Sequence, residues 1–268
     1  MTDLPAAAIL GLLEGLTEFL PVSSTGHLIL ARSLLGLSGG VVDSFTVVIQ
    51  SGAILAVLVL YRQRFRALLP FARRPPGSGR FSGFHGLLLL GLTSLPACLA
   101  GLAAHSVIKE RLFNPAAVAL ALIAGALCML FLEYRKREPR FLTPDEITPG
   151  LALGIGLCQC LALWPGFSRS AATIMGGMLL GVSRGAAAEY SFIAAVPVMF
   201  AATAFDLCVN LGSMGWEELP FFAVGLAAAF LSALAAIKGF LSVLGRIGLA
   251  PFAWYRLLLA PLTYWFFS

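Results

Sequence analysis

Charged side chains are scarce in this sequence of 268 residues, of which only 12% are Asp, Glu, Lys or Arg. A soluble globular domain carries about 25% charged residues, so the shortage argues against a soluble enzyme. Hydrophobic residues make up 59% of the chain, and several apolar runs approach the roughly 20 residues that a helix needs to cross a bilayer. The composition therefore predicts an all-α polytopic membrane protein.

The sequence also lacks the cysteine patterns that are typical of metal centres and disulfide frameworks. Its five cysteines lie in or beside apolar stretches, and the two that lie closest together, Cys158 and Cys160, do not share a helix face. We interpret them as packing residues. The chain begins without the basic segment of a cleaved signal peptide, so we expect its first apolar segment to be retained.

Acidic residues are absent from one stretch that is rich in arginine. Residues 61–80 hold six arginines and no Asp or Glu. A basic connection between apolar spans is typical of a cytoplasmic loop, and we prefer this interpretation to a patch that binds nucleic acid. Alternation then places the basic connections at 135–140 and 238–246 inside and the acidic stretch 206–218 outside.

Six segments are predicted to span the membrane. They are residues 45–61, 84–104, 115–134, 187–207, 218–237 and 251–267. Two further regions, 4–37 and 148–183, each contain two shorter apolar limbs around a polar break centred on proline. An apolar limb of about 10–14 residues is more typical of a re-entrant segment than of a span. We therefore predict six transmembrane helices plus two re-entrant helical hairpins.

The two hairpin regions resemble each other. Pro21 and Ser24 recur as Pro165 and Ser168, both at an offset of 144 residues. The loop charges place the opening of the first hairpin outside and that of the second inside, so the two tips would meet near mid-membrane. This arrangement predicts an inverted-topology repeat within one integral membrane domain, as in many transporters. The predicted halves are residues 1–134 and 135–268.

The first polar break is preceded by two glutamates in an apolar limb. Glu14 and Glu18 are four apart, so on a helix they share one face. Neighbouring carboxylates repel each other in a low dielectric. A divalent cation such as Mg²⁺, which binds carboxylates and phosphate oxygens, would relieve that repulsion, and so would a nearby Arg or protonated His. Alternatively, the pair lines an entrance at the membrane surface. We favour a functional role because ionisable groups are costly within a membrane.

Hydroxyl groups and an imidazole follow the first break. Ser23, Ser24 and Thr25 can cap the helix that follows. Their hydroxyl groups can also bind an anion together with the free N–H groups at the start of that helix. Gly26 allows a ligand to approach the backbone closely. His27 is either a structural group or an acid, base or nucleophile, and its polar neighbours favour the chemical role.

The second polar break carries one cation among hydroxyl groups. Arg169 is the only charged residue between positions 152 and 183. Its guanidinium matches phosphate oxygens, although an interfacial arginine can instead reach lipid head groups. We predict that Arg169 binds phosphate. The neighbouring hydroxyl groups expected to assist it belong to Ser168, Ser170 and Thr173.

Both motifs, and the chain nearly from end to end, resemble the undecaprenyl-diphosphate phosphatases of the bacitracin-resistance type. The matching segments are Glu14-xxx-Glu18, Pro21-Val-Ser-Ser-Thr-Gly-His27 and Pro165-Gly-Phe-Ser-Arg169-Ser. The resemblance implies hydrolysis of the terminal phosphate of undecaprenyl diphosphate, which recycles the lipid carrier for peptidoglycan synthesis and gives bacitracin resistance. It also implies a bacterial cytoplasmic membrane location, a site open to the outer face, and a divalent cation, Mg²⁺ or Ca²⁺.

By motif position, the resemblance also implies roles for individual residues. Glu14 and Glu18 would be the acidic, metal-associated pair, with Glu18 also catalytic. Ser24 or His27 would be the nucleophile or acid–base group, with the choice left open, and Arg169 would be the phosphate clamp.

Two other functions compete with the phosphatase. An inverted-repeat lipid flippase or transporter would have the same architecture, and a non-catalytic lipid-binding module would have the same polar tips. The combination of Glu, Ser, His and Arg favours the enzyme, because transport of a neutral solute needs no such set. The small-residue spacing Gly177–Gly181 permits close helix contacts and hence a homodimer.

Overall fold

Five helices of the structure are long and apolar enough to cross a membrane. This computed structural model describes residues 3–69, 79–135, 138–210 and 216–267. The five are α3 (Gly40–Leu60), α5 (Gly83–Ala103), α7 (Pro115–Tyr134), α10 (Arg184–Asn210) and α11 (Leu219–Ile247). Each overlaps one predicted span, which confirms a multi-pass membrane fold. The predicted basic connection at 238–246 is wrong, because α11 continues through these residues to Ile247. The sixth predicted span corresponds to α12 (Ala250–Phe267), a helix of 18 residues that is not among the five.

Short helical segments occupy the connections. They are α4 (Arg62–Leu68), α6 (His105–Val107), η1 (Ile108–Leu112), η2 (Pro144–Glu146) and η5 (Trp216–Glu218). The predicted arginine loop begins with α4, whereas residues 70–78 of that loop lie outside the described residues, as do residues 211–215 of the acidic connection. Every element named in the described part of the chain is helical, which confirms the all-α fold class.

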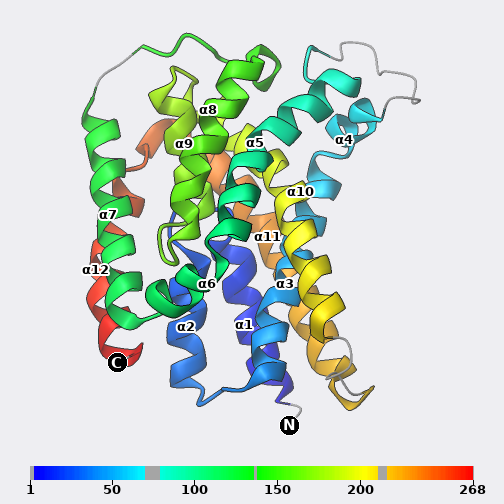
Figure 1. Cartoon of the computed structure of the whole chain (residues 1–268), viewed down its shortest axis with the longest axis vertical. Helices are drawn as coiled ribbons and strands as arrows, with labels where there is room; N and C mark the ends of the chain where they lie inside the picture. The colour runs from blue at the N-terminus through cyan, green and yellow to red at the C-terminus, as the bar shows by residue number, and fades with distance from the viewer. Residues whose placement is uncertain (1–2, 70–78, 136–137, 211–215, 268) are drawn as a thin grey trace.

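Both predicted hairpins are present, and they enter from opposite ends of the molecule. The first consists of α1 (Leu4–Thr17) and α2 (Ser24–Leu34). The second consists of α8 (Pro149–Gln159), the turn η3 (Cys160–Leu163) and α9 (Arg169–Leu179). In Figure 1 the blue hairpin lies toward the end that holds the N-terminus and the green hairpin descends from the other end. The two polar breaks therefore face each other near the middle.

The second helix of each hairpin starts at a serine with an unusual backbone. Ser23 has φ 71° and Ser168 has φ 76°, and each side chain accepts a hydrogen bond from the N–H three residues later, in Gly26 and Ala171. A positive φ is unfavourable for a residue with a side chain, and such strain concentrates at functional sites. The structural equivalent of Ser168 is therefore Ser23, not Ser24, which corrects the predicted offset by one residue.

Helices of the two predicted halves are interleaved. The first helix of each hairpin packs against a span of the other half, α1 against α11 and α8 against α5. The second helices do the same, α2 against α12 and α9 against α7. Small residues permit this packing, since a Cβ on Gly11 would collide with the carbonyl oxygen of Gly225. These reciprocal contacts support the inverted repeat, whose division at residues 134 and 135 stays a prediction.

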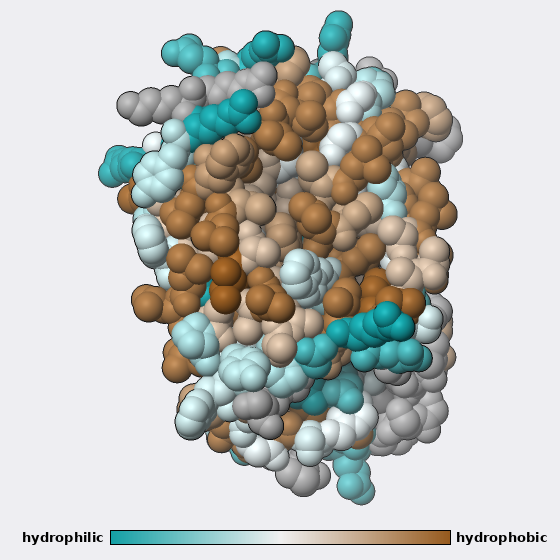
Figure 2. All heavy atoms as spheres, turned by 60° about the vertical axis from the view of Figure 1, so that its left-hand side comes forward, coloured by the Kyte–Doolittle hydropathy of each residue, from teal (hydrophilic) through white to brown (hydrophobic). Residues whose placement is uncertain are grey.

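On the face shown in Figure 2, apolar side chains cover the middle, and hydrophilic side chains gather toward the two ends. Leu102, for example, is 76% exposed. A broad apolar surface promotes aggregation in water, whereas in a bilayer it contacts lipid.

The Gly177–Gly181 spacing does not form a helix surface. Helix α9 ends at Leu179, and Gly181 lies beyond it with φ 93°. Gly177 faces Ala187 of α10, so a Cβ there would press on that helix. The spacing therefore serves internal packing and gives no support to the predicted homodimer.

Candidate active site

A cavity of about 230 Å³ lies where the turns of the two hairpins meet. Six of the residues predicted from the sequence line it: Glu18, Ser23, Ser24, Thr25, Ser168 and Arg169. Gln50 of α3, Ala97 of α5 and Ala202 of α10 form part of the remaining wall. Two clusters that are far apart in the sequence thus share one cavity.

Glu18 links the two hairpins through its carboxylate. Its Oε1 accepts a bond of 2.8 Å from Nη2 of Arg169, and its Oε2 accepts a bond of 2.6 Å from the hydroxyl of Ser24. The Glu18 and Arg169 side chains are 10% and 12% exposed, so water screens their attraction only weakly. The carboxylate is therefore positioned to orient the guanidinium and to accept the Ser24 proton.

Further contacts fix the guanidinium of Arg169. Nη1 donates to the carbonyl oxygen of Ser191 at 3.3 Å, and Nη2 also lies 3.2 Å from the sulfur of Met199. The guanidinium carbon is 5.4 Å from the centre of the Phe19 ring. Its Nε–H has no partner among the described residues. A guanidinium held in place in the wall of a cavity suits a phosphate oxygen.

Glu14 lies one turn before Glu18 on α1 and is fully buried. Its carboxylate interacts with that of Glu18, yet neither of its oxygens accepts a hydrogen bond from a donor in the described part of the chain. A buried charge without donors is unfavourable, and two adjacent carboxylates fit a divalent cation. No group of three or more His, Cys, Asp or Glu side chains that could hold a metal ion occurs in the described residues, and cation binding by Glu14 and Glu18 stays a prediction.

His27 lies behind the cavity rather than in its wall. Nδ1 is 2.7 Å from the carbonyl oxygen of Ser23, so this nitrogen must donate. Nε2 is 2.6 Å from the hydroxyl of Tyr255, and in the neutral ring it accepts from that hydroxyl. Both nitrogens are thus occupied. Of the two predicted nucleophiles, Ser24 faces the cavity and His27 supports the turn.

Three predicted phosphate-binding residues also lie outside the cavity wall. Ser170 donates to the carbonyl oxygen of Leu20 at 2.8 Å and so joins the two turns. The hydroxyl of Thr173 lies 2.6 Å from that of Ser191 in α10. The N–H of Gly26 donates to the capping serine of its own helix. These contacts hold the turns in place, and phosphate binding by the three residues stays a prediction.

The model of one protein family, described as Bacitracin resistance protein BacA, matches residues 7–262 of the chain. The chain belongs to this family. The match includes the second hairpin and nearly all of the first hairpin and of the six long helices.

Several similar proteins carry the name Undecaprenyl-diphosphatase. The one from Nitratidesulfovibrio vulgaris (strain Hildenborough) is 61% identical over 268 residues, which is 100% of both chains. The one from Desulfovibrio desulfuricans is 59% identical over 266 residues, 99% of both chains. The one from Lawsonia intracellularis is 52% identical over 266 residues, 98% of both chains.

Sequence reasoning missed four polar residues around the site of this BacA-family chain. Gln50 and Gln159 line the cavity, and Oε1 of Gln159 is buried without a partner in the described residues. Tyr255 binds the imidazole of His27, and Arg256 binds both hairpin turns. Each is a polar side chain inside an apolar segment, which is the signal that could have identified it.

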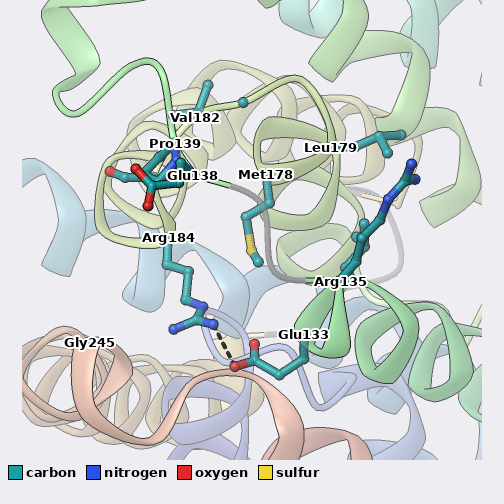
Figure 3. Close-up of a pocket in the computed structure, with 12 residues that line it drawn as sticks. Glu133, Arg135, Glu138, Pro139, Met178, Leu179, Val182, Arg184 and Gly245 are labelled. Carbon is teal, nitrogen blue, oxygen red and sulfur yellow. Dashed lines mark hydrogen bonds and ion pairs between the residues drawn. The ribbon is translucent and has the colours of Figure 1, made fainter.

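A second, larger cavity of about 330 Å³ is lined by none of the site residues that were predicted from the sequence. It lies at the end of the molecule where α7 and α9 stop and α10 starts. Figure 3 shows Arg184 and Glu133 facing each other there, joined by an ion pair of 2.6 Å. The second carboxylate oxygen of Glu133 accepts from the N–H of Leu249 at 3.1 Å. The Glu133 carboxylate therefore joins α7 to α10 and to the start of α12. Residues of the two sequence motifs line the smaller cavity instead.

Proposed function

We propose that the protein hydrolyses the terminal phosphate of undecaprenyl diphosphate and releases undecaprenyl phosphate. Membership of the BacA family and the name of its relatives support this reaction. The observation that carries the proposal is the chain of contacts from Ser24 through Glu18 to Arg169 in the wall of a cavity. The reaction recycles the lipid carrier for peptidoglycan synthesis and accounts for bacitracin resistance.

Ser24 is the attacking group in this proposal. Its Oγ bonds to the terminal phosphorus as the bond from phosphorus to the bridging oxygen breaks, and Glu18 takes the hydroxyl proton. Undecaprenyl phosphate leaves with the electron pair of the broken bond. Water then forms a bond to phosphorus as the bond to Oγ of Ser24 breaks. Glu18 returns its proton to Oγ, and inorganic phosphate leaves with both protons of the water.

Arg169 neutralises charge on the transferred phosphoryl group. Phosphoryl transfer depends mainly on positioning and on electrostatic stabilisation. The ion pair with Glu18 holds the guanidinium in the cavity before substrate arrives, so little reorganisation is needed. The hydroxyl groups of Ser23, Thr25 and Ser168 belong to the same wall and would donate to the other phosphate oxygens.

A divalent cation, Mg²⁺ or Ca²⁺, is part of the proposal. Glu14 and Glu18 would hold it, because the Glu14 carboxylate is buried next to that of Glu18 and receives no hydrogen bond from an N–H or O–H of the described residues. The bound ion would supply positive charge to the diphosphate.

The position of the cavity suits a lipid substrate at the outer face of a bacterial cytoplasmic membrane. Ala97, Leu163 and Val198 give the wall an apolar part, so the isoprenyl tail would remain among apolar helices. Ala97 and Ala202 lie in the second halves of α5 and α10. With the basic connections inside, both helices run toward the outside, and the cavity opens there.

Phosphate release by the purified protein tests the proposal. With undecaprenyl diphosphate and Mg²⁺ in detergent, the wild-type protein should release one phosphate per lipid, and chromatography should show the monophosphate as the product. Arg169→Ala should lose this activity, and Glu138→Gln, which alters the larger cavity, should keep it. Equal release by wild type and Arg169→Ala would contradict the proposal. Transport of the lipid across liposomes without phosphate release would instead favour the flippase.

A further inference from the structure

A second buried arginine, Arg256 of α12, contacts the turns of both hairpins. Its side chain is 0% exposed. Nη2 donates to the carbonyl oxygens of Gly166 at 3.0 Å and Ala121 at 3.1 Å, and Nη1 donates to that of Pro21 at 3.5 Å. One guanidinium therefore joins the first turn, the second turn and α7.

The two turn carbonyls lie within two residues of serines that line the cavity. Pro21 precedes Ser23 by two residues, and Gly166 precedes Ser168 by two residues. These serines are the two strained helix caps, and Gly166 itself lines the cavity. A shift of the Pro21 carbonyl would therefore move the hydroxyl groups of the first hairpin, and a shift of the Gly166 carbonyl would move Arg169 of the second.

Carbonyl oxygens, rather than a carboxylate, surround this cation. None of the ion pairs in the described residues includes Arg256. A buried charge without a counter-ion is unfavourable. A neutral hydrogen-bond donor in place of Arg256 could join the helices at a smaller desolvation cost. The guanidinium presents five N–H donors in a rigid planar fork, so its two terminal nitrogens can bond acceptors on three chain segments at once.

We propose that Arg256 is a positioning residue that sets the separation of the two hairpin turns. It acts through the carbonyls of Pro21 and Gly166, so that Glu18 and Arg169 meet across the cavity, and it touches no substrate. The kinetic consequence rests on the proposed phosphatase function, whereas the structural consequence does not.

A glycine of α7 offers a second way to disturb the same guanidinium. A Cβ on Gly125 would collide with Nη2 of Arg256, whereas a Cβ on Gly91 of α5 would meet open space. Both glycines lie inside membrane-spanning helices. Gly125→Ala and Gly91→Ala are therefore a matched pair, of which only the first displaces the arginine.

Steady-state kinetics provide the first test. Since a misplacement of about 1 Å can lower a rate about 100-fold, kcat for phosphate release should fall by about this factor in Arg256→Ala, with a smaller change in KM. Gly125→Ala should lower kcat, and Gly91→Ala should match wild type. Guanidinium ions should restore part of the kcat of Arg256→Ala, and ammonium ions should not. A wild-type kcat in Arg256→Ala, alongside an inactive Arg169→Ala, would overturn the inference and leave the proposed function intact.

A distance measurement tests the inference without activity. Leu34 of α2 and Leu153 of α8 are exposed, one on each hairpin, and cysteines there can carry spin labels in a background without native cysteines. Pulsed EPR spectroscopy should give a narrow distance distribution in the wild-type and Gly91→Ala backgrounds and a broadened or shifted one with Arg256→Ala. An unchanged distribution would refute the positioning role, whether or not the protein releases phosphate.

Discussion

Nη2 of Arg169 lies 2.8 Å from Oε1 of Glu18, although the two residues are 151 positions apart in the chain. The ion pair joins the second hairpin to the first. The first turn supplies the carboxylate and the Ser24 hydroxyl, and the second supplies the guanidinium. The cavity has both only because the hairpins enter from opposite ends of the molecule and meet in the middle (Figure 1).

Replacing Glu18 by glutamine keeps the shape of the side chain and removes its charge. An amide cannot take the Ser24 proton, so we expect kcat for phosphate release to fall about 10²- to 10⁴-fold. Glu110→Gln, at an exposed glutamate outside the cavity, is the control and should keep the wild-type rate. An unchanged kcat in Glu18→Gln would mean that another group accepts the proton.

The identity of the attacking atom can be read from the trapped phosphoenzyme. With label in the terminal phosphate of the substrate and rapid acid quenching, the wild-type protein should carry an acid-stable phosphoserine, and Ser24→Ala should carry none. His27→Gln should retain more activity than Ser24→Ala, because a glutamine amide can still bond Ser23 and Tyr255. An acid-labile label that persists in Ser24→Ala would identify the histidine as the nucleophile instead.

Binding of a divalent cation by Glu14 can be tested by removing the metal and by replacing Glu14. Removing metal with a chelator should abolish phosphate release, and Mg²⁺ or Ca²⁺ should restore it. In Glu14→Gln, the metal concentration for half-maximal activity should rise about 10- to 100-fold, the range seen when groups around a bound metal are altered. Full activity in the presence of the chelator would show that the two glutamates serve another purpose.

The ion pair at the larger cavity should matter for stability and not for catalysis. The Arg184 side chain is 37% exposed, so solvent screens its attraction to Glu133. We expect Glu133→Gln to lower the free energy of unfolding by only about 1 kcal/mol, as measured by unfolding in detergent, with kcat unchanged. A folded but inactive variant would bring the larger cavity into the mechanism.

Membrane orientation can be tested at two connections. A cysteine at position 110, between α5 and α7, should react with an impermeant thiol reagent on intact cells, in a background without native cysteines. A cysteine at position 138, between α7 and α8, should react only after permeabilisation. The reverse pattern would place the cavity on the cytoplasmic side.

The architecture was predictable because its signals are coarse. The lengths of the apolar runs indicated the spans, the limbs of about 10–14 residues indicated the hairpins, and charges isolated in apolar sequence indicated the site. The register within the turns was not predictable, since backbone strain at Ser23 and Ser168 decides which residue caps the helix. The sequence repeat had matched Ser24, not Ser23, to Ser168.

The directions in which side chains point also could not be predicted from the sequence. His27 belongs to the motif, but Tyr255, 228 positions away, holds its ring outside the cavity wall. Arg256 is the opposite case. It is the only charged residue in the last predicted span, the same signal that identified Arg169, so its importance could have been inferred before the structure.

If the two hairpins form one site, Glu18 and Arg169 must act as a unit. The most direct measurement is kcat/KM for phosphate release in wild type, Glu18→Gln, Arg169→Ala and the double variant. Groups that act together give losses that do not add in free energy, so the double variant should be no slower than the slower single variant. Two losses that multiply in the double variant would contradict a shared site.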